Sequence, residues 1–342
     1  MRNKLLYLSY YIKELDKKKF SLFLDEAKKQ TGRSSIAIVS DVIKSVFAYN
    51  ISILEYFQFR FYEKSDAQRE TYAGTGYMYE YQLKMNPKST RSVLENKLQF
   101  LNDYKNFVQH AHVSLAELEK EPRLADQLLA NKSGKIVLKN ALGQCGNSIE
   151  VIATQGITQK DVIDRLRKSG NDLVEEFVVQ HPDLMRLSPS GLNTVRIITQ
   201  LNAKNEVDIL GARLRITINS SVDNLAAGNI AAPINVQTGK LEGPGVYSDI
   251  TKNDEDIHPV TQTAITGFQL PYWQESLALV TAAALNNIGN RSIGWDVAIT
   301  ADGPELIEGN HNWCKLLWQL PVKQGLKPIL ENYLHKNVPV GV

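Results

Sequence analysis

Two kinds of hydrophobic spacing divide the chain at about residue 92. In the first part, apolar residues recur at helical spacing over residues 21–29, 35–49 and 51–61, which predicts three amphipathic helices. In the second part, stretches that alternate between apolar and polar residues are interleaved with helical stretches. The pattern therefore predicts a mostly helical N-terminal region over residues 1–92, followed by a domain of the α+β class.

The segments from residue 93 onward predict two lobes within one domain, residues 93–325, and a helical tail over residues 326–342. The small lobe, over about residues 110–178, has the order strand, small-residue loop, strand, helix, strand. The large lobe, over about residues 179–325, contains β-branched strands, a helix with proline at its first turn and glycine past its end, and a terminal hairpin. The elements expected are helices at 96–109, 158–170, 271–289 and 326–335, and strands at 134–139, 149–153, 172–179, 193–201, 207–218 and 229–236.

The most informative stretch lies between residues 292 and 310, where two alternating strands flank a tight Asp-Gly turn. A hairpin brings the start of its first strand beside the end of its second, so Asp296 would lie next to Glu308 and Asn310. Glu308 and Asn310 are two residues apart, so their side chains leave the same face of the strand. Three oxygen donors, two of them carboxylates, suit a hard cation such as Mg²⁺ that bridges nucleotide phosphates.

The alternative is an ordinary surface hairpin whose acidic side chains are solvated. The ribbon is too apolar for a free surface position, since it carries Trp295, Val297, Ile299, Leu306 and Ile307. Carboxylates on a largely buried ribbon are costly unless a metal ion or a partner compensates their charge. The composition of the hairpin therefore favours a metal site.

The spacing Asp296-x11-Glu308-x-Asn310 on a terminal hairpin resembles the magnesium site of the ATP-grasp ligases. The residues around it, Gly-Trp-Asp-Val-Ala-Ile-Thr, Asp-Gly-Pro and Leu-Ile-Glu-Gly-Asn, are similar to the branch called sugar-transfer-associated ATP-grasp proteins. That branch is related to D-alanine–D-alanine ligase-like and glutamate ligase-like enzymes, and it is found with polysaccharide and cell-surface glycan genes. The resemblance covers about residues 90–320 and implies the ATP-grasp fold, in which two α+β lobes hold ATP between them.

Lysines and glycines of the small lobe match the phosphate-binding parts of that fold. Lys139 ends a strand directly before a loop that contains Gly143 and Gly146, so it would lie along the phosphates while loop amides approach them. Lys97 matches the earlier lysine of the fold, which also reaches the phosphates. A plain turn and a surface lysine explain the same residues when each is taken alone, whereas their order before the metal motif supports a nucleotide site.

The segment from Glu175 to Val178 resembles the connection between the two lobes of the family. By that resemblance, the acidic pair and the backbone of Phe177 and Val178 contact the adenine edge. Adjacent side chains of a strand point to opposite faces, so only one of Glu175 and Glu176 can do so, and we favour Glu175 for the adenine amino group. Asp183 is the expected ribose partner.

Two further segments, Asn193-Thr-Val-Arg196 and Arg213-Leu-Arg215, are similar to the family's strands that carry asparagine and arginine. By this resemblance Asn193 contributes to the nucleotide site, and the three arginines contribute to catalysis. Arg213 and Arg215 share one face of a strand, and arginine forks bind phosphate and carboxylate groups. Arg215 would hold a tetrahedral oxyanion. A surface ladder of arginines is the alternative, and the apolar residues on the other face of that strand argue against it.

The chain departs from the family pattern close to this site. Asn229 stands in place of a second glycine, and Asn235 stands where an aspartate is expected. The run His311-Asn312 replaces the Pro-Gly of related ligases. These departures leave the magnesium motif intact and bear on the acceptor substrate.

The composition indicates an ordinary globular protein and gives no information about its substrate. The 342 residues carry a net charge of +2, with 22% charged and 43% hydrophobic residues, so nothing requires a nucleic-acid partner. Two cysteines give no disulfide framework, and no stretch approaches a transmembrane segment or a signal-peptide core, so we expect a reduced, cytoplasmic location. The basic N-terminal residues leave open a helix peripheral to the inner membrane face. A helix packed on its own domain explains the same residues.

The sequence therefore predicts an ATP- and Mg²⁺-dependent carboxylate–amine ligase that works through an acyl phosphate on small substrates, an amino acid or a sugar acid. The resemblance implies a role in cell-surface polysaccharide, glycan or capsule biosynthesis, with glycosyltransferases as candidate partners. Two alternatives stay open: a phosphotransferase (kinase) on the same scaffold, and a non-catalytic nucleotide-binding scaffold that assists glycosyltransferases. The complete set of Asp296, Glu308 and Asn310 argues against the scaffold but does not separate a ligase from a kinase.

Overall fold

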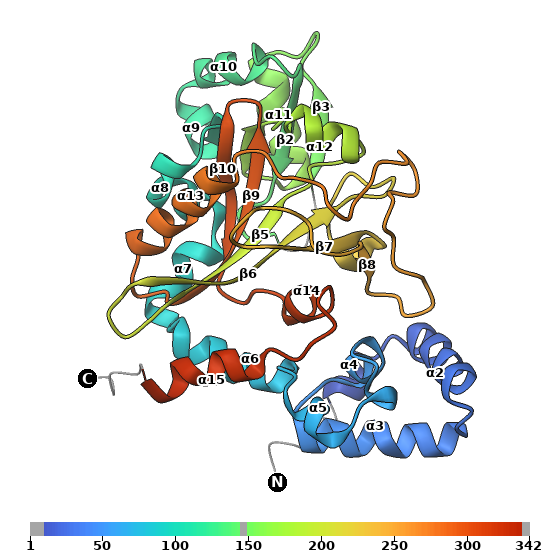
Figure 1. The fold of residues 1–342 in the computed structure, drawn as a ribbon. Helices are drawn as coiled ribbons and strands as arrows, with labels where there is room; N and C mark the ends of the chain where they lie inside the picture. The colour runs from blue at the N-terminus through green and yellow to red at the C-terminus, as the bar shows by residue number, and fades with distance from the viewer. Residues whose placement is uncertain (1–9, 144–148, 337–342) are drawn as a thin grey trace.

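The structure, a computed structural model, describes residues 10–143 and 149–336. Figure 1 shows two β-sheets, with helices from both ends of the chain below them. This mixed α+β architecture with a helical N-terminal region confirms the predicted fold class. The helices before the first strand are α2 (Lys17–Thr31), α3 (Ser35–Tyr49), α4 (Ile53–Gln58), α5 (Asp66–Glu70), α6 (Thr75–Met85), α7 (Lys88–Glu95) and α8 (Lys97–Asp103), with the 3-10 turns η1 (Phe61–Glu63) and η2 (Lys105–Phe107).

Polar caps and an aromatic core shape the N-terminal helices. Asp16 accepts hydrogen bonds from the backbone amides of Lys18 and Lys19 and so caps α2. Ser52 and Glu55 form a reciprocal capping box at the start of α4. The aromatic side chains between these helices pack against one another and are buried: Phe23, Tyr56, Phe57, Phe59, Phe61, Tyr62 and Tyr72. The aromatic run of this region therefore forms the core of a helical bundle.

A four-stranded antiparallel sheet follows, with the strand order β1–β4–β2–β3. The helix between β3 and β4 begins after Thr158, which forms a capping box with Asp161. Gly170 ends that helix in the left-handed conformation, at φ 72°. The helices enclose an apolar core against one face of the sheet. The strands are β1 (His112–Ser114), β2 (Lys135–Lys139), β3 (Glu150–Ala153) and β4 (Leu173–Glu176), and the helices are α9 (Leu115–Lys120), η3 (Pro122–Leu124), α10 (Ala125–Leu129) and α11 (Gln159–Ser169).

A six-stranded antiparallel sheet forms the second layer, with the strand order β10–β9–β5–β6–β7–β8. One face packs against α8 and α13 around the largest apolar core, to which Trp295 and Val297 belong. The opposite face carries the polar residues described below and contacts α14. The elements are α12 (Pro182–Leu187), β5 (Val195–Leu201), β6 (Val207–Ile216), η4 (Leu225–Ala227), β7 (Ile230–Ile234), β8 (Val246–Tyr247), α13 (Trp273–Asn286), β9 (Ser292–Thr300), β10 (Gly303–Asn310), α14 (Lys315–Gln319) and α15 (Lys327–Lys336).

Several expected elements are shorter in the structure, among them a helix before the small sheet and a strand within it. The helix expected over residues 96–109 stops at the end of α8, and the amides of Gln109 and His110 donate to the carboxylate of Glu305. The strand expected over residues 172–179 stops at the end of β4, where Glu176 pairs with Ile136 and the Phe177 amide donates to the carbonyl of Lys135, the first residue of β2.

The predicted domain boundaries near residues 92 and 325 stay predictions. Helix α6 precedes the first boundary, and helix α15 follows the second. Both helices pack into one apolar cluster with Trp313 and Trp318. This cluster lies against the face of the six-stranded sheet that α14 also contacts. Residues from both ends of the chain thus cover the same part of the molecule (Figure 1).

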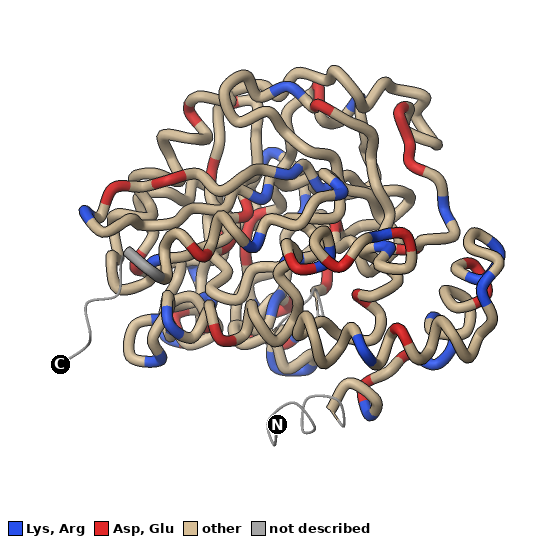
Figure 2. Tube along the Cα trace, turned by 60° about the horizontal axis from the view of Figure 1, so that its bottom comes forward, with Lys and Arg blue, Asp and Glu red and all other residues tan. Residues whose placement is uncertain are grey.

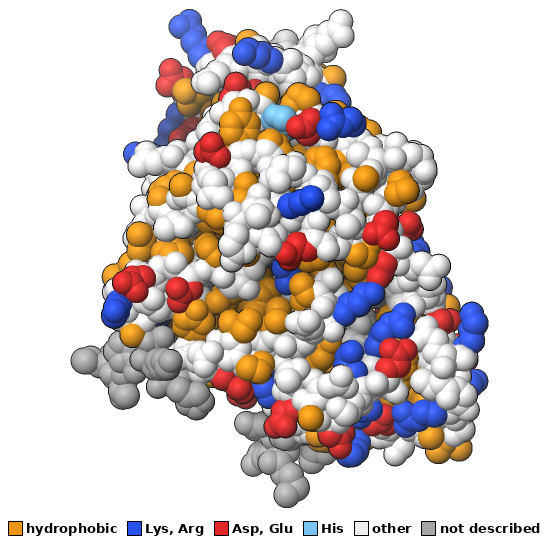
Figure 3. Space-filling model, viewed as in Figure 1, with side chains coloured by type: hydrophobic (Ala, Val, Ile, Leu, Met, Phe, Trp, Pro, Cys, Tyr) orange, Lys and Arg blue, Asp and Glu red, His pale blue; other side chains and the backbone are white. Residues whose placement is uncertain are grey.

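Charged residues of both signs are spread along the chain, and in the view of Figure 2 the positions of basic and acidic residues are interspersed. This distribution agrees with the net charge of +2. On the face seen in Figure 3, hydrophobic side chains gather in the lower half, between the sheets and the helices below them. Within residues 10–143 and 149–336, no helix is both long enough and apolar enough to cross a membrane.

Candidate active site

A β-bulge in the terminal hairpin decides which side chains share a face. Leu306 pairs with Val297, but the next pair is Glu308 with Asp296, so Ile307 is an extra residue on β10. Strict alternation would place Glu308 on the core face together with Leu306. The bulge reverses that parity, so Glu308 lies directly opposite Asp296, on the polar face of the sheet.

The two carboxylates of this pair have opposite pKa shifts. Burial raises the pKa of Asp296, but Arg196 and Arg215 outweigh this effect and hold the pKa at about 2. Burial and the neighbouring charge of Asp296 both raise the pKa of Glu308. The amide of Asn310 donates to Glu308 Oε1 at 3.2 Å. The three residues predicted as metal ligands are therefore neighbours, and their negative charge is incompletely compensated at Glu308.

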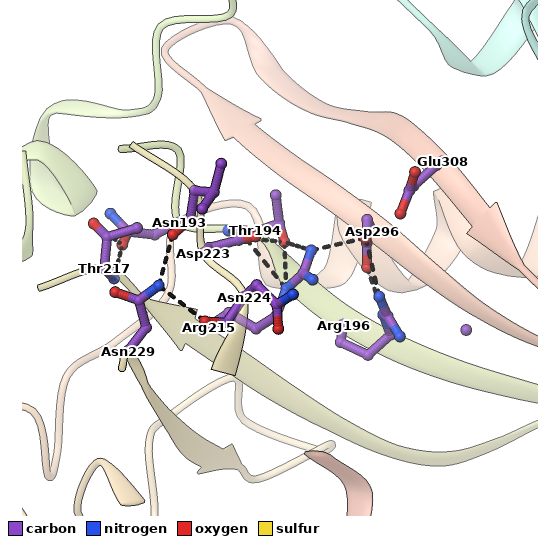
Figure 4. A network of polar contacts seen from close by, with 12 residues as sticks. Asn193, Thr194, Arg196, Arg215, Thr217, Asp223, Asn224, Asn229, Asp296 and Glu308 are labelled. Carbon is purple, nitrogen blue, oxygen red and sulfur yellow. Dashed lines mark hydrogen bonds and ion pairs between the residues drawn. The ribbon is translucent and has the colours of Figure 1, made fainter. Parts of the chain in front are cut away.

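Two arginines approach Asp296 from the next two strands of the sheet, Arg196 from β5 and Arg215 from β6 (Figure 4). Arg196 binds it with two parallel hydrogen bonds, Nε to Oδ1 at 2.5 Å and Nη2 to Oδ2 at 3.0 Å. Arg215 Nη2 lies 2.7 Å from Asp296 Oδ2. Gly294 makes room for this arrangement, because a Cβ there would lie 3.1 Å from Arg196 Cδ and 2.5 Å from Trp313 Cβ.

Thr194 and Asp223 complete the environment of Arg215, and sequence reasoning gave neither of them a role. Arg215 Nε lies 2.9 Å from Thr194 Oγ1 and 3.2 Å from Asp223 Oδ2. Thr194 donates to that same Asp223 oxygen, from its backbone amide at 3.0 Å and from its hydroxyl at 2.5 Å. Burial raises the pKa of Asp223, partly opposed by Arg215. The Asp223-Asn224 dipeptide was visible in the sequence, but its contact with Thr194, 29 residues away, was not.

Arg213 and Asn193 do not join this cluster. Arg213 pairs across the sheet with Arg196, but its guanidinium donates to the carbonyl of Trp318 in α14, from Nε at 3.1 Å and Nη2 at 2.5 Å. Burial lowers the pKa of Arg213 to about 10. The amide of Asn193 donates to Gln180 Oε1 at 2.9 Å and accepts from the backbone of Thr217 at 2.8 Å. In this structure both side chains join elements of the protein to one another.

The two predicted lysines come from other elements than the hairpin, since Lys97 begins α8 and Lys139 ends β2 of the small sheet. Lys139 forms an ion pair with Glu175, which comes from the adjacent strand. Lys97 donates to the carbonyl of Gly143. Burial lowers the pKa of Lys97, with opposing contributions from Glu308 and Glu175 and a further lowering from Lys139. Lys97 therefore lies within electrostatic range of Glu308 and of Lys139, and Lys139 itself is paired with Glu175. Gly146 lies outside the described residues.

The other predicted nucleotide contacts are Glu176, Phe177, Val178 and Asp183, and three of them have partners within the protein. Glu176 accepts a long hydrogen bond of 3.4 Å from the amide of Ala111. The ring of Phe177 lies 5.3 Å from the ammonium of Lys135. Val178 is half-buried, and Asp183 Oδ1 lies 3.1 Å from Arg186 Nη1. Their roles toward a nucleotide stay predictions.

His110 and Glu305 form an ion pair that sequence reasoning missed. His110 Nδ1 lies 2.7 Å from Glu305 Oε2, and His110 Nε2 lies 3.9 Å from Glu175 Oε2. The two residues of the ion pair are 195 positions apart along the chain. No spacing rule could have joined them, although an isolated buried acid on the hairpin signals that a partner is required.

The donor set fits a hard divalent cation. Asp296 and Glu308 supply carboxylate oxygens and Asn310 an amide oxygen, and burial together with the charge of Asp296 raises the pKa of Glu308. Within the described residues, no group of three His, Cys, Asp or Glu side chains could hold a metal ion. A cation at the pair would therefore take its remaining ligands from Asn310, water or substrate phosphates, as Mg²⁺ commonly does.

A family model described as sugar-transfer associated ATP-grasp matches residues 77–334. The match extends further at both ends than the resemblance seen in the sequence. No curated protein sequence matches the chain.

The solved structures to which the chain is similar include one carboxylase domain and two ligases. The biotin carboxylase domain of a Hydrogenobacter thermophilus 2-oxoglutarate carboxylase, in complex with MgADP and bicarbonate, is 13% identical with a TM-score of 0.39 over 68% of this chain and 46% of that chain. An L-amino acid ligase from Bacillus licheniformis is 15% identical with a TM-score of 0.42 over 71% and 48%. D-alanine–D-alanine ligase from Helicobacter pylori is 13% identical with a TM-score of 0.43 over 72% and 62%. The matched part of the chain thus spans less than two thirds of each of these proteins.

Proposed function

Because the chain belongs to the sugar-transfer associated ATP-grasp family, we propose that it is an ATP- and Mg²⁺-dependent ligase that joins a carboxylate to an amine or a hydroxyl. The observation that carries the proposal is the buried carboxylate pair of Asp296 and Glu308, which a β-bulge places side by side next to two arginines. A structural hairpin has no need for adjacent buried carboxylates, because their repulsion and desolvation are unfavourable.

Each group in the cluster has a distinct task in this proposal. Asp296, Glu308 and Asn310 would hold Mg²⁺, which neutralises negative charge on the β- and γ-phosphates when it is bound. Lys97 from α8 and Lys139 from the small sheet contribute further positive charge. A nucleotide between the two sheets would thus have its triphosphate enclosed by charges of the opposite sign.

The proposed reaction needs no nucleophilic side chain. A carboxylate oxygen of the substrate attacks the γ-phosphorus, ADP leaves, and an acyl phosphate forms. An amine or hydroxyl then attacks the acyl carbon, loses its proton, and expels inorganic phosphate. Arg215 would stabilise the oxyanion of this second step, because Thr194, Asp223 and Asp296 hold its guanidinium in one orientation.

The family's association with sugar transfer supports a substrate from glycan metabolism. We propose an amino acid or a sugar acid as the carboxylate, and a role in cell-surface polysaccharide or capsule biosynthesis in the cytoplasm. Glycosyltransferases are the partners that this role suggests.

Isotope labelling of the carboxylate tests the reaction type. With an ¹⁸O-labelled carboxylic acid, the released phosphate should carry one labelled oxygen, because the bond between acyl carbon and oxygen breaks in the second step. A kinase would leave a phosphorylated product and no free phosphate, and a binding scaffold would consume no ATP. Amino acids and uronic acids are the first substrates to screen.

Glu308→Gln provides the control for that experiment. It removes a charge from the pair and keeps the shape of the side chain, so labelled phosphate should disappear while the fold remains. Asp296→Asn is a less specific control, because Arg196 and Arg215 would lose part of their compensating charge. Unlabelled phosphate from the wild-type enzyme, or labelled phosphate at the normal rate from Glu308→Gln, would contradict the proposal.

A further inference from the structure

His110 lies where the chain passes from α8 and η2 to the small sheet, and it is bound to the hairpin of the large sheet. Its ring Nδ1 lies 2.7 Å from Glu305 Oε2. The backbone amides of Gln109 and His110 donate to the same oxygen at 2.9 Å each. His110 is 7% exposed. These contacts fix the position of the imidazole relative to both sheets.

The other side of the ring faces a predicted nucleotide contact. His110 Nε2 lies 3.9 Å from Glu175 Oε2, and the same carboxylate oxygen is paired with Lys139. Burial lowers the pKa of His110, but the two flanking carboxylates outweigh this effect and the pKa is raised overall. In the row Glu305–His110–Glu175–Lys139, acidic and basic side chains therefore alternate, and each carboxylate lies next to at least one basic group.

ATP binding disturbs this balance if Lys139 turns to the phosphates. Glu175 is 4% exposed, so its carboxylate would lose a close cation without gaining access to water. An unpaired buried carboxylate is strongly unfavourable. The imidazole of His110 is the nearest remaining group that can carry a compensating charge.

We propose that His110 is a positioning residue for ATP: as an imidazolium it compensates Glu175 when Lys139 leaves that carboxylate for the nucleotide phosphates. This inference rests on the proposed function, which assigns Lys139 to the phosphates. It adds that a histidine outside the family motifs determines how readily the lysine is released. Protonation of His110 is then part of ATP binding.

The direction of the pH effect follows from the groups that face the ring. They are Glu305 on β10, Glu175 on β4, Lys139 on β2 and His112 on β1. Departure of the Lys139 ammonium removes a positive neighbour, so the pKa of His110 rises further on binding. ATP affinity should therefore be highest where His110 is already protonated in the free protein, and it should fall as the pH rises above that pKa.

Calorimetric titration with a non-hydrolysable ATP analogue and Mg²⁺ tests the proposal. Measurements run between about pH 7 and pH 9, where the protonation of the phosphate groups, with a pKa near 6, changes little. His110→Gln should bind roughly tenfold more weakly at pH 7, the effect of losing about one favourable charge interaction, and its affinity should lack the pH dependence of the wild type. The matched control is His258→Gln, which replaces another buried histidine. Its Nε2 lies 2.9 Å from the Thr217 carbonyl, and its Nδ1 accepts hydrogen bonds from the backbone amides of Val260 and Thr261. That control should leave both the affinity and its pH profile unchanged.

A double-variant cycle separates this role from general damage to the fold. In a Glu175→Gln background there is no carboxylate to compensate, so adding His110→Gln should change the affinity little. Proton uptake on analogue binding, measured for the wild type in two buffers of different ionisation enthalpy, gives an independent readout that needs no variant. Uptake should increase with pH.

The outcomes distinguish this inference from the proposed function. A wild-type protein that fails to bind the analogue overturns both. Wild-type binding without proton uptake, or an equal loss from His110→Gln in the Glu175→Gln background, overturns the inference alone.

Discussion

Arg213 and Arg215 show at the scale of single residues how two like side chains on one strand acquire different surroundings. Both leave the polar face of β6. Arg215 lies among Thr194, Asp223 and Asp296. Arg213, two residues earlier on the strand, donates to the carbonyl of Trp318. The pKa shifts follow these partners, because carboxylates raise the pKa of Arg215 against the effect of burial, and burial without such partners lowers that of Arg213 to about 10.

Lysine substitution should distinguish these two arginines. Arg215→Lys keeps a positive charge but loses the fork that binds several acceptors at once, so turnover should fall roughly a hundredfold while ATP affinity changes little. Arg213→Lys should leave turnover within about threefold and lower the free energy of unfolding by about 1–2 kcal/mol, since hydrogen bonds to the Trp318 carbonyl are lost. Steady-state kinetics and urea unfolding check both variants. Equal kinetic losses would contradict the structural role of Arg213.

The β9–β10 hairpin is the element that brings the proposed metal ligands together. Its tight turn fixes the pairing from Gly303 and Thr300 onward, and the bulge at Ile307 then changes which residues share a face. Because of that single extra residue, Glu308 lies on the polar face opposite Asp296 although Leu306 lies in the core. The register of the hairpin, and not the ligand residues alone, creates the carboxylate pair.

Changing the length of β10 by one residue tests this dependence. Deletion of Ile307 removes the bulge but leaves Glu308 opposite Asp296 by regular pairing, so binding of Mg²⁺ and an ATP analogue should persist. Insertion of one alanine after Ile307 moves Glu308 along the strand or onto the core face, so binding should weaken at least about tenfold through loss of a metal ligand. Calorimetric titration of both variants decides the matter. Weaker binding by the deletion than by the insertion would contradict the role assigned to the bulge.

At the scale of the whole molecule, the N-terminal helical bundle is tied to the segment that follows the hairpin. Glu55 in α4 is 1% exposed and lies 3.0 Å from the ammonium of Lys315 in α14. It also accepts from the backbone amides of Ser52 at 2.7 Å and Thr75 at 3.0 Å. The attraction of Glu55 outweighs burial and raises the pKa of Lys315. The bundle and the sheet domain therefore share a buried ion pair.

Removing one partner of this pair should destabilise the whole protein. Lys315→Met leaves a buried carboxylate without its cation and should lower the free energy of unfolding by about 3 kcal/mol. Adding Glu55→Gln to that variant should recover at least about 1 kcal/mol, because the uncompensated charge is gone. Lys44→Met, at an exposed pair with Asp66, is the control and should cost less than about 0.5 kcal/mol. Urea unfolding measures all three, and a loss as small as that of the control would show that the buried pair is not a stabilising contact.

The sequence alone determined the features that depend on near neighbours along the chain. Periodicity and turn residues predicted the helical region, the strands and the terminal hairpin, because backbone conformation responds to local side chains. That Asp296 and Glu308 lie in neighbouring strands was also predictable, since both belong to one hairpin, but the bulge that places them on the same face was not. That Lys139 ends a strand directly before a loop was predictable for the same reason.

Only the tertiary structure decided which distant groups meet and which way equivalent side chains turn. His110 with Glu305, and Glu55 with Lys315, are pairs between segments that are separate in the chain and join only when the elements pack. The different contacts of Arg213 and Arg215 could not be predicted from the sequence either. Strand periodicity specifies the face on which a side chain lies but not the residue that it contacts. The physical reason is that burial makes an unpaired charge costly, and the pairing that removes this cost is selected by the three-dimensional arrangement of the whole chain.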